Sequence, residues 1–287
     1  MQSDATAANF RPRSVMGNKM AGVKVEYNSD PKETDEQIEA RLFDRFQILD
    51  QLTTACIKGY ARALIVSGPP GLGKSFTVEQ ELRTWDPNER NHTIIKGYVK
   101  ATGLYKLLWQ YKNKGQVIVF DDADSVFFDD TSLNLIKAIC DTNDIRRVSY
   151  LAEGGLVDEE TASRIPKQFE FNGTVIFLTN YDFDMMIDRG HKLAPHLQAL
   201  VSRSHYIDLT LKTARDYIIR IKQVINNGLL DNKGLNKQEQ KDCIDFIENN
   251  KEKLRELSLS IALKIAAIRK SNKPNWKSIA RITCCRN

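Results

Sequence analysis

The chain has 287 residues, of which 41% are hydrophobic and 28% are charged. This length predicts one large domain or two modest ones, and the hydrophobic fraction excludes wholesale disorder. The balance of 42 basic against 37 acidic side chains gives a net charge of +5, which permits nucleic-acid binding without requiring it.

No apolar run approaches the roughly 18 residues that a membrane helix needs, and the first residues lack the apolar core of a secretory signal. The five cysteines have neither the spacing of a zinc site nor that of a disulfide framework. We therefore expect a cytoplasmic protein from a reducing compartment, with no membrane partner.

Residues 1–33 are polar and without periodicity, so we expect a flexible N-terminal arm. A helix is predicted next, because Thr34-Asp-Glu-Gln37 has the form of a capping box and apolar residues at helical spacing follow it as far as a stop at Gly59. Strand-length apolar runs then alternate with helical stretches, which predicts an α/β class with a mainly parallel five-stranded sheet covered on both faces. The runs span residues 63–66, 93–96, 117–120, 175–178 and 206–209.

Beyond Leu211 the strand patterns end, and only helical patterns remain. We therefore divide the ordered chain into an α/β domain over residues 34–210 and a small helical domain over residues 211–287. The helices are predicted over residues 213–225, 237–250, 258–270 and 275–282.

A phosphate-binding motif lies between the first predicted strand and the next helix, and it matches the pattern GxxxxGK[ST]. Its glycines permit turns that aim successive backbone N–H groups at a phosphate, and the following helix adds its positive N-terminal end. We expect Lys74 to reach the β- and γ-phosphates of ATP and Ser75 to ligate Mg²⁺, whereas the alternative is a chance turn before a helix. The expected nucleotide-binding residues are Gly68, Pro69, Pro70, Gly71, Leu72, Gly73, Lys74, Ser75 and Phe76.

Paired acids end the third predicted strand, in the run Val117-Ile-Val-Phe-Asp121-Asp122. Ligands of open α/β sheets bind at the C-terminal ends of strands, where these carboxylates are expected. We assign Asp121 to the Mg²⁺ shell and Asp122 to orienting or deprotonating the attacking water. A solvated strand end is the alternative, and the phosphate loop upstream argues against it.

From Thr34 onward, these ordered motifs resemble those of the AAA+ P-loop ATPases. The resemblance implies a P-loop three-layer αβα core followed by a helical lid, with ATP and Mg²⁺ as cofactors. It also implies a homo-oligomer, in the form of a hexameric ring of the clamp-loader or unfoldase kind, and it is compatible with a phage or mobile-element origin. The family usually has Glu as the second acid of this motif, so the shorter Asp122 is a departure that bears on the rate of hydrolysis.

Two further residues take their expected roles from this resemblance. Asn180 follows the strand at 175–178 and resembles the sensor 1 residue that positions the lytic water, although a turn-forming Asn is the alternative. Ser202-Arg203 resembles the Ser-Arg element of clamp loaders, so Arg203 is the expected arginine finger acting on a neighbouring subunit. Arg189 is the second choice, and a lone surface arginine is the alternative. The sensor 2 cation and the residues that read adenine stay unassigned.

The segment Gly97-Tyr98-Val99-Lys100 lies between the second predicted strand and a helix over residues 104–111. It resembles the pore loop of ring-shaped unfoldases, in which Tyr98, Val99 and Lys100 would grip polypeptide. A strand–loop junction with an aromatic anchor is the equally weighted alternative.

A long insertion separates residues 140 and 174, and two alternating segments at 145–150 and 167–171 predict a hairpin within it. It is similar to a hairpin that touches DNA in viral helicases and branch-migration motors. Arg146, Arg147, Arg164 and Lys167 make it partly basic, but nearby acidic residues offset this charge.

Together the motifs predict an ATP hydrolase that works at the subunit interfaces of a ring to remodel or translocate a macromolecule, with polypeptide preferred to DNA. A DNA-directed motor or loader of replication or recombination is one alternative. A slowly hydrolysing assembly scaffold is the other, favoured by Asp122 and by the missing sensor 2.

Overall fold

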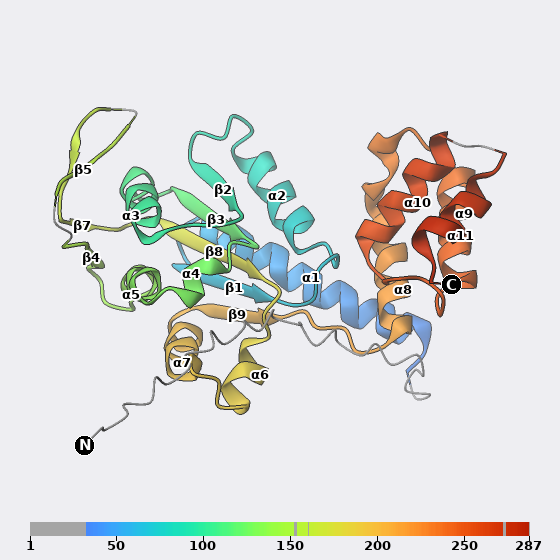
Figure 1. Ribbon diagram of the computed structural model, residues 1–287, viewed down its shortest axis with the longest axis horizontal. Helices are drawn as coiled ribbons and strands as arrows, with labels where there is room; N and C mark the ends of the chain where they lie inside the picture. Colours follow the sequence, from blue (N-terminus) through green and yellow to red (C-terminus); the bar gives the residue numbers. More distant parts are fainter. Residues whose placement is uncertain (1–32, 152–153, 160, 272–273, 287) are drawn as a thin grey trace, which may run out of the picture.

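Five parallel strands form the centre of the computed structural model, which describes residues 33–151, 154–159, 161–271 and 274–286 (Figure 1). The strand order is β2-β3-β8-β1-β9, and each strand runs parallel to its neighbours. Strands β1, β3 and β8 are buried along their whole length, as expected for apolar runs covered on both faces. The bounds are β1 Ala63–Ser67, β2 His92–Lys96, β3 Val117–Asp121, β8 Thr174–Thr179 and β9 His205–Asp208.

Helix α1 (Asp35–Ile57) begins and ends where the sequence predicts. The Thr34 hydroxyl accepts a hydrogen bond from the Gln37 amide at 3.2 Å, and the Gln37 side chain accepts one from the Thr34 amide at 2.8 Å. At the other end, Gly59 has a φ of +74°, in the left-handed region that stops a helix. The arm expected over residues 1–33 lies outside the described residues except for Glu33.

Helices cover both faces of the sheet and make three layers (Figure 1). Alternate strand residues face opposite ways, so Leu64 and Val66 belong to the buried cluster that includes α1 and α2, whereas Ile65 belongs to the cluster that includes α3, α5 and α7. The short helices α4 and α6 belong to the second of these layers. The bounds are α2 Lys74–Trp85, α3 Ala101–Gln110, α4 Ser125–Phe128, α5 Asp130–Ile139, α6 Phe183–Asp188 and α7 Ala194–Arg203.

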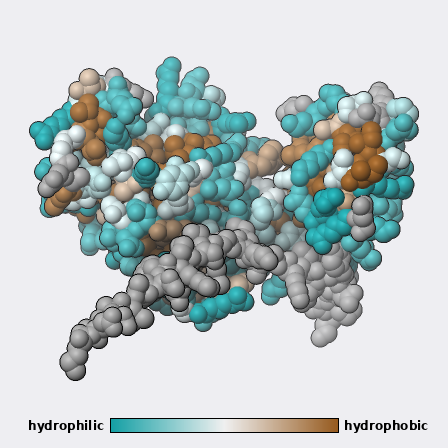
Figure 2. Space-filling model, in the orientation of Figure 1, coloured by the Kyte–Doolittle hydropathy of each residue, from teal (hydrophilic) through white to brown (hydrophobic). Residues whose placement is uncertain are grey.

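Among the described residues after β9, α-helices α8 to α11 form a separate bundle, the lid, at the right of Figure 1. Figure 2, in the same orientation, shows hydrophobic side chains gathered on the visible face of this bundle. Its apolar core is continuous with the layer of α1 and α2, because Leu72 of the P-loop and Leu259 of α10 belong to the same buried cluster. The predicted αβα core with a helical lid is therefore confirmed, while the exact division at residue 210 stays a prediction. The bounds are α8 Ala214–Val224, α9 Lys237–Asn249, α10 Leu259–Ser271 and α11 Trp276–Cys284, with a π-helix at Ile225–Leu229 and a 3-10 turn at Asp231–Lys233.

The insertion forms the predicted hairpin, in which β4 (Arg147–Ser149) pairs antiparallel with β7 (Gln168–Glu170). A second antiparallel pair, β5 (Leu156–Val157) with β6 (Arg164–Ile165), extends it outward (Figure 1). The expectation that Arg146 adds basic surface here is wrong. Its guanidinium is buried and donates to the carbonyl oxygens of Ile139 at 2.8 Å and Gly173 at 2.9 Å, so it fastens the base of the hairpin to the core.

None of the helices within the described ranges combines the length and the apolar character that crossing a bilayer requires.

Leu42→Ala tests how α1 packs. Leu42 is fully buried, whereas Phe43 beside it is 54% exposed. Removing the buried side chain leaves a cavity, so we expect the free energy of unfolding to fall by about 2–5 kcal/mol in urea denaturation. Phe43→Ala is the matched control and should change it by less than about 0.5 kcal/mol. Equal losses in the two variants would contradict this placement of α1.

Candidate functional site

The P-loop connects β1 to α2 at the C-terminal edge of the sheet. Gly73 is the N-cap of α2 with a φ of +96°, and Gly71 has a φ of +75°, so both positions favour glycine. A Cβ at Gly71 would lie 2.5 Å from Cβ of Ser258, and the Leu259 amide donates to the Gly71 carbonyl oxygen at 2.7 Å. The start of lid helix α10 therefore rests directly on the phosphate-binding loop.

The side chains of the P-loop face different surroundings. Leu72 is 1% exposed and packs into the core, so only its main chain can face a phosphate. Phe76, in the first turn of α2, is 39% exposed. Pro69 contributes its carbonyl oxygen to Lys74, at 3.0 Å from Nζ. The loop thus offers main-chain groups and one cation rather than a polar side-chain pocket.

Lys74 is 5% exposed, and its ammonium is held by oxygen atoms. It donates to the carbonyl oxygens of Gly68 and Pro69 and, at 3.0 Å, to Oδ1 of Asn180. Burial lowers the pKa of Lys74 to about 8, although the nearby Asp122 and Asp121 oppose this shift. The side chain is therefore mostly charged at neutral pH and joins the loop after β1 to the end of β8.

A hydroxyl and a carboxylate meet in the position expected for Mg²⁺. Ser75 Oγ donates to Oδ1 of Asp121 at 2.7 Å, and Asp121 is 4% exposed. Two such oxygens suit Mg²⁺, which keeps several waters and takes further ligands from phosphates. The predicted pairing of these two residues is thus present in the geometry, and their oxygens fit the ion.

Lys96 is a neighbour of this pair that the sequence reasoning missed. Its ammonium lies 3.0 Å from Oδ2 of Asp121 and 3.0 Å from a carboxylate oxygen of Glu79 on α2. The contact arises because Lys96 and Asp121 are register partners at the ends of β2 and β3. Only the register between the two strands identifies this contact, because a lysine at the end of a strand does not by itself indicate a role at the site.

Asn180 and Asp122 form a second pair beside Lys74. The Asn180 amide nitrogen donates to Oδ1 of Asp122 at 2.8 Å, while its oxygen accepts from Lys74. Asp122 has a φ of +53°, an uncommon conformation for a residue other than glycine that is enriched at functional sites. Burial and the adjacent Asp121 raise the pKa of Asp122. The order of the sheet creates this contact, because β8 lies between β1 and β3.

The acidic segment at residues 121–124 continues into helix α4, which is hydrogen-bonded to the predicted pore loop. Ser125, the first residue of α4, accepts a hydrogen bond from the Val99 amide at 3.0 Å and donates to the Val99 carbonyl oxygen at 3.4 Å. Next to this anchor, Tyr98 is 77% exposed, and Lys100 is the N-cap of α3. The exposed tyrosine is therefore tied to a helix that starts four residues after Asp121.

Arg220 of lid helix α8 is a cation at the P-loop that the sequence reasoning also missed. Its Nε donates to the Leu72 carbonyl oxygen at 3.3 Å, and its guanidinium lies 3.2 Å above the ring of Phe46. Burial lowers the pKa of Arg220 to about 9. Its only sequence signal was a charge among isoleucines in a predicted amphipathic helix. Two cations of α10 are paired within the lid: Lys264 with Glu256, and Arg269 with Glu239 and Asp242.

Arg203 lies apart from the residues around the P-loop. It ends α7, on the part of the core remote from the lid (Figure 1). Its guanidinium lies 3.3 Å from the Lys137 carbonyl oxygen and 3.7 Å from a carboxylate oxygen of Asp141. Arg189, the second choice, is the C-cap of α6. Neither arginine contacts the P-loop of its own chain.

No protein-family model matches the chain. Over 261 residues the chain is 37% identical to an uncharacterized 36.7 kDa protein from the nrdC–mobD intergenic region of Enterobacteria phage T4, a match that covers 90% of this chain and 78% of that protein. The chain belongs to the family of this phage protein. Its parallel sheet, with a P-loop after β1 and a helical lid after β9, has the fold that the motifs indicated, that of the AAA+ P-loop ATPases. The phage relative fits the expected phage or mobile-element origin.

Two solved structures, each 12% identical to this chain, are similar to it. The RuvB Holliday junction branch migration motor of Thermotoga maritima matches 87% of this chain and 69% of its own with a TM-score of 0.46. NtrX of Brucella abortus in complex with ADP matches 80% of this chain and about half of its own, 51%, with a TM-score of 0.44.

Arg220→Leu tests the contact between lid and P-loop. The variant removes the donor to Leu72 and should lower the free energy of unfolding by about 1.5–3 kcal/mol, the range for hydrogen bonds to charged groups. Hydrogen exchange of a peptide covering residues 68–75 should become faster. Arg269→Leu, which breaks ion pairs within the lid only, is the control and should leave that peptide unchanged. Unaltered exchange in the Arg220 variant would show that the contact does not hold the loop.

Proposed function

We propose that this protein binds Mg²⁺-ATP at the P-loop and hydrolyses it. The observation that carries the proposal is the convergence, at one edge of the sheet, of a buried ammonium, a hydroxyl–carboxylate pair and a carboxylate–amide pair. Lys74 would balance charge on the β- and γ-phosphates, while Ser75 and Asp121 would hold Mg²⁺. Bound there, the ion would neutralise charge that develops on the transferred phosphoryl group.

Asp122 is the residue that we assign to proton acceptance from the attacking water. Burial and the adjacent Asp121 raise its pKa, which makes it a better base than an ordinary carboxylate. Asn180 would keep the carboxylate in place through its amide nitrogen and orient the water with it. Because an aspartate is one methylene shorter than the glutamate usual in the family, slow turnover is part of this proposal.

The active unit in this proposal is a ring, most simply a hexamer. Arg203 is partly exposed on α7 and far from the P-loop of its own chain, which is where an arginine finger for a neighbouring subunit would lie. A head-to-tail contact of this kind closes into a ring when the rotation permits. Hydrolysis would then depend on assembly, since the arginine finger of each site would come from a neighbouring subunit.

The work proposed for this ring is the movement of a polypeptide. Tyr98 offers an exposed aromatic contact with no deep pocket, and Val99 and Lys100 flank it, so the loop suits a sliding chain. Ser125 gives a direct route from the acidic segment to this loop, because it bonds both the amide and the carbonyl of Val99. A DNA-directed motor is the second candidate, favoured by the exposed Arg147, Arg164 and Lys167 of the insertion.

Mixing two inactive variants tests the proposal. Arg203→Ala should bind ATP but hydrolyse it at least about tenfold more slowly, as loss of an arginine finger does. Asp122→Asn should also bind ATP and fail in turnover. A mixture of the two should regain part of the phosphate release, because some interfaces then combine an intact Asp122 with an intact Arg203. A mixture no more active than its separate parts, with assembly confirmed by mass measurement, would reject action between subunits.

A further inference from the structure

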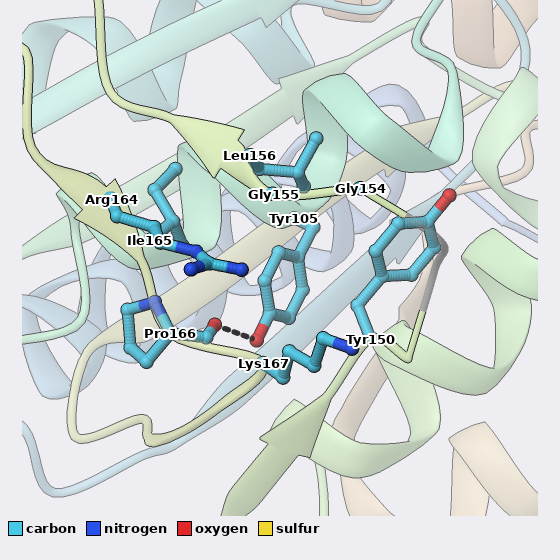
Figure 3. Close-up of a pocket in the computed structure, with 9 residues that line it drawn as sticks. All are labelled: Tyr105, Tyr150, Gly154, Gly155, Leu156, Arg164, Ile165, Pro166 and Lys167. Carbon is cyan, nitrogen blue, oxygen red and sulfur yellow. Dashed lines mark hydrogen bonds between the residues drawn. The ribbon is translucent and has the colours of Figure 1, made fainter.

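A pocket of about 300 Å³ lies between α3 and the outer part of the insertion (Figure 3), and no P-loop residue lines it. Tyr105 of α3 forms its floor, and the Tyr105 hydroxyl donates to the Pro166 carbonyl oxygen at 2.9 Å. The ring of Tyr150 lies 5.2 Å from that of Tyr105, and Leu156 and Ile165 complete an apolar wall. The pocket is therefore amphipathic, because its body is apolar and cations stand at its rim.

Two cations reach into this pocket, from either side of the Tyr105 ring (Figure 3). Arg164 and Lys167 are exposed, and neither has an acidic partner among the described residues. Gly155 allows the position of Arg164, because a Cβ there would lie 2.9 Å from Nε and 3.3 Å from Cζ. The guanidinium thus lies close to the backbone of Gly155, where a larger residue would displace it.

We propose that this pocket captures the C-terminal residue of a polypeptide, with an apolar side chain against Tyr150 and Leu156 and the terminal carboxylate between Arg164 and Lys167. A carboxylate fits a guanidinium fork and an ammonium at short range. The volume is at the small end for ligand pockets, which suits a chain end rather than a continuous polymer. The two tyrosine rings touch each other, so no slot remains between them for a nucleic-acid base.

The pocket lies close to the loop that is proposed to move polypeptide, and the choice of a polypeptide as its ligand rests on that proposed function. Tyr105 is on α3, which begins directly after the Tyr98 loop, and a helix rises 1.5 Å per residue. Tyr105 therefore lies only about 6 Å along α3 from Ala101. A chain end held here would enter next to the exposed tyrosine that is proposed to pull it.

Fluorescence anisotropy with a labelled peptide of sequence Gly-Ser-Gly-Ser-Gly-Phe, bearing a free terminal carboxylate, tests the pocket. The full chain should bind it, and amidation of the peptide C-terminus should weaken binding at least about tenfold. Arg164→Gln and Lys167→Gln should each weaken binding of the free-acid peptide by about tenfold, the effect of losing a charged hydrogen bond. They should have no effect on the amidated peptide, since it has no carboxylate to lose.

Lys106→Gln is the matched control, because Lys106 pairs with Glu159 at 2.8 Å and does not line the pocket. It removes the same charge and should leave peptide affinity unchanged. Equal binding of acid and amide, or equal loss in all three variants, would overturn the proposal. The proposal would also be overturned, in favour of a nucleic-acid site, if the protein bound a twelve-nucleotide oligothymidylate through Arg164 and bound no peptide. The assay contains no ATP, so it can succeed or fail independently of the nucleotide site.

Discussion

The buried ammonium of Lys74 is the constraint on which the rest of the site depends. Burying a cation until it is 5% exposed costs free energy of folding unless oxygen atoms surround it. Here the P-loop carbonyls and Asn180 supply these oxygen atoms. This requirement couples three separate parts of the chain: the loop after β1, the end of β8 and, through Asn180, the carboxylate of Asp122. In the proposed function, an anion that draws Lys74 toward itself would disturb the hydrogen bond to Asn180, and the site would sense what is bound in this way.

The lid adds a second set of constraints to the same loop. The Leu259 amide and the Arg220 guanidinium both donate to P-loop carbonyls, and Ser258 fits only because position 71 is glycine. The lid and the first layer of helices also share one apolar cluster. A change in the conformation of the P-loop therefore acts directly on α8 and α10. Hinge movement of a lid against its core is a common way in which nucleotide binding produces a large motion.

The parts of this fold that the sequence predicted are those with local causes. The glycine spacing of the P-loop, the capping box at Thr34 and the uninterrupted apolar runs of β1, β3 and β8 each act over a few residues. Arg146, Lys96 and Arg220 could not be placed in this way, because their surroundings come from distant segments. Arg146 looked like basic surface, yet it donates to carbonyl oxygens of α5 and of the segment between β7 and β8. Arg220 reaches a loop 148 residues earlier in the chain.

The most direct test of the account is calorimetric titration of the intact chain with Mg²⁺-ATP, beside Lys74→Met. For the original chain, the account predicts a saturable heat of binding with about one nucleotide per chain. The variant should keep its fold and give no heat of binding, because Lys74 is the only buried ammonium among the described P-loop residues that could bind the phosphates. Well-folded protein that gives no heat, or a variant that binds as tightly as the original chain, would contradict it.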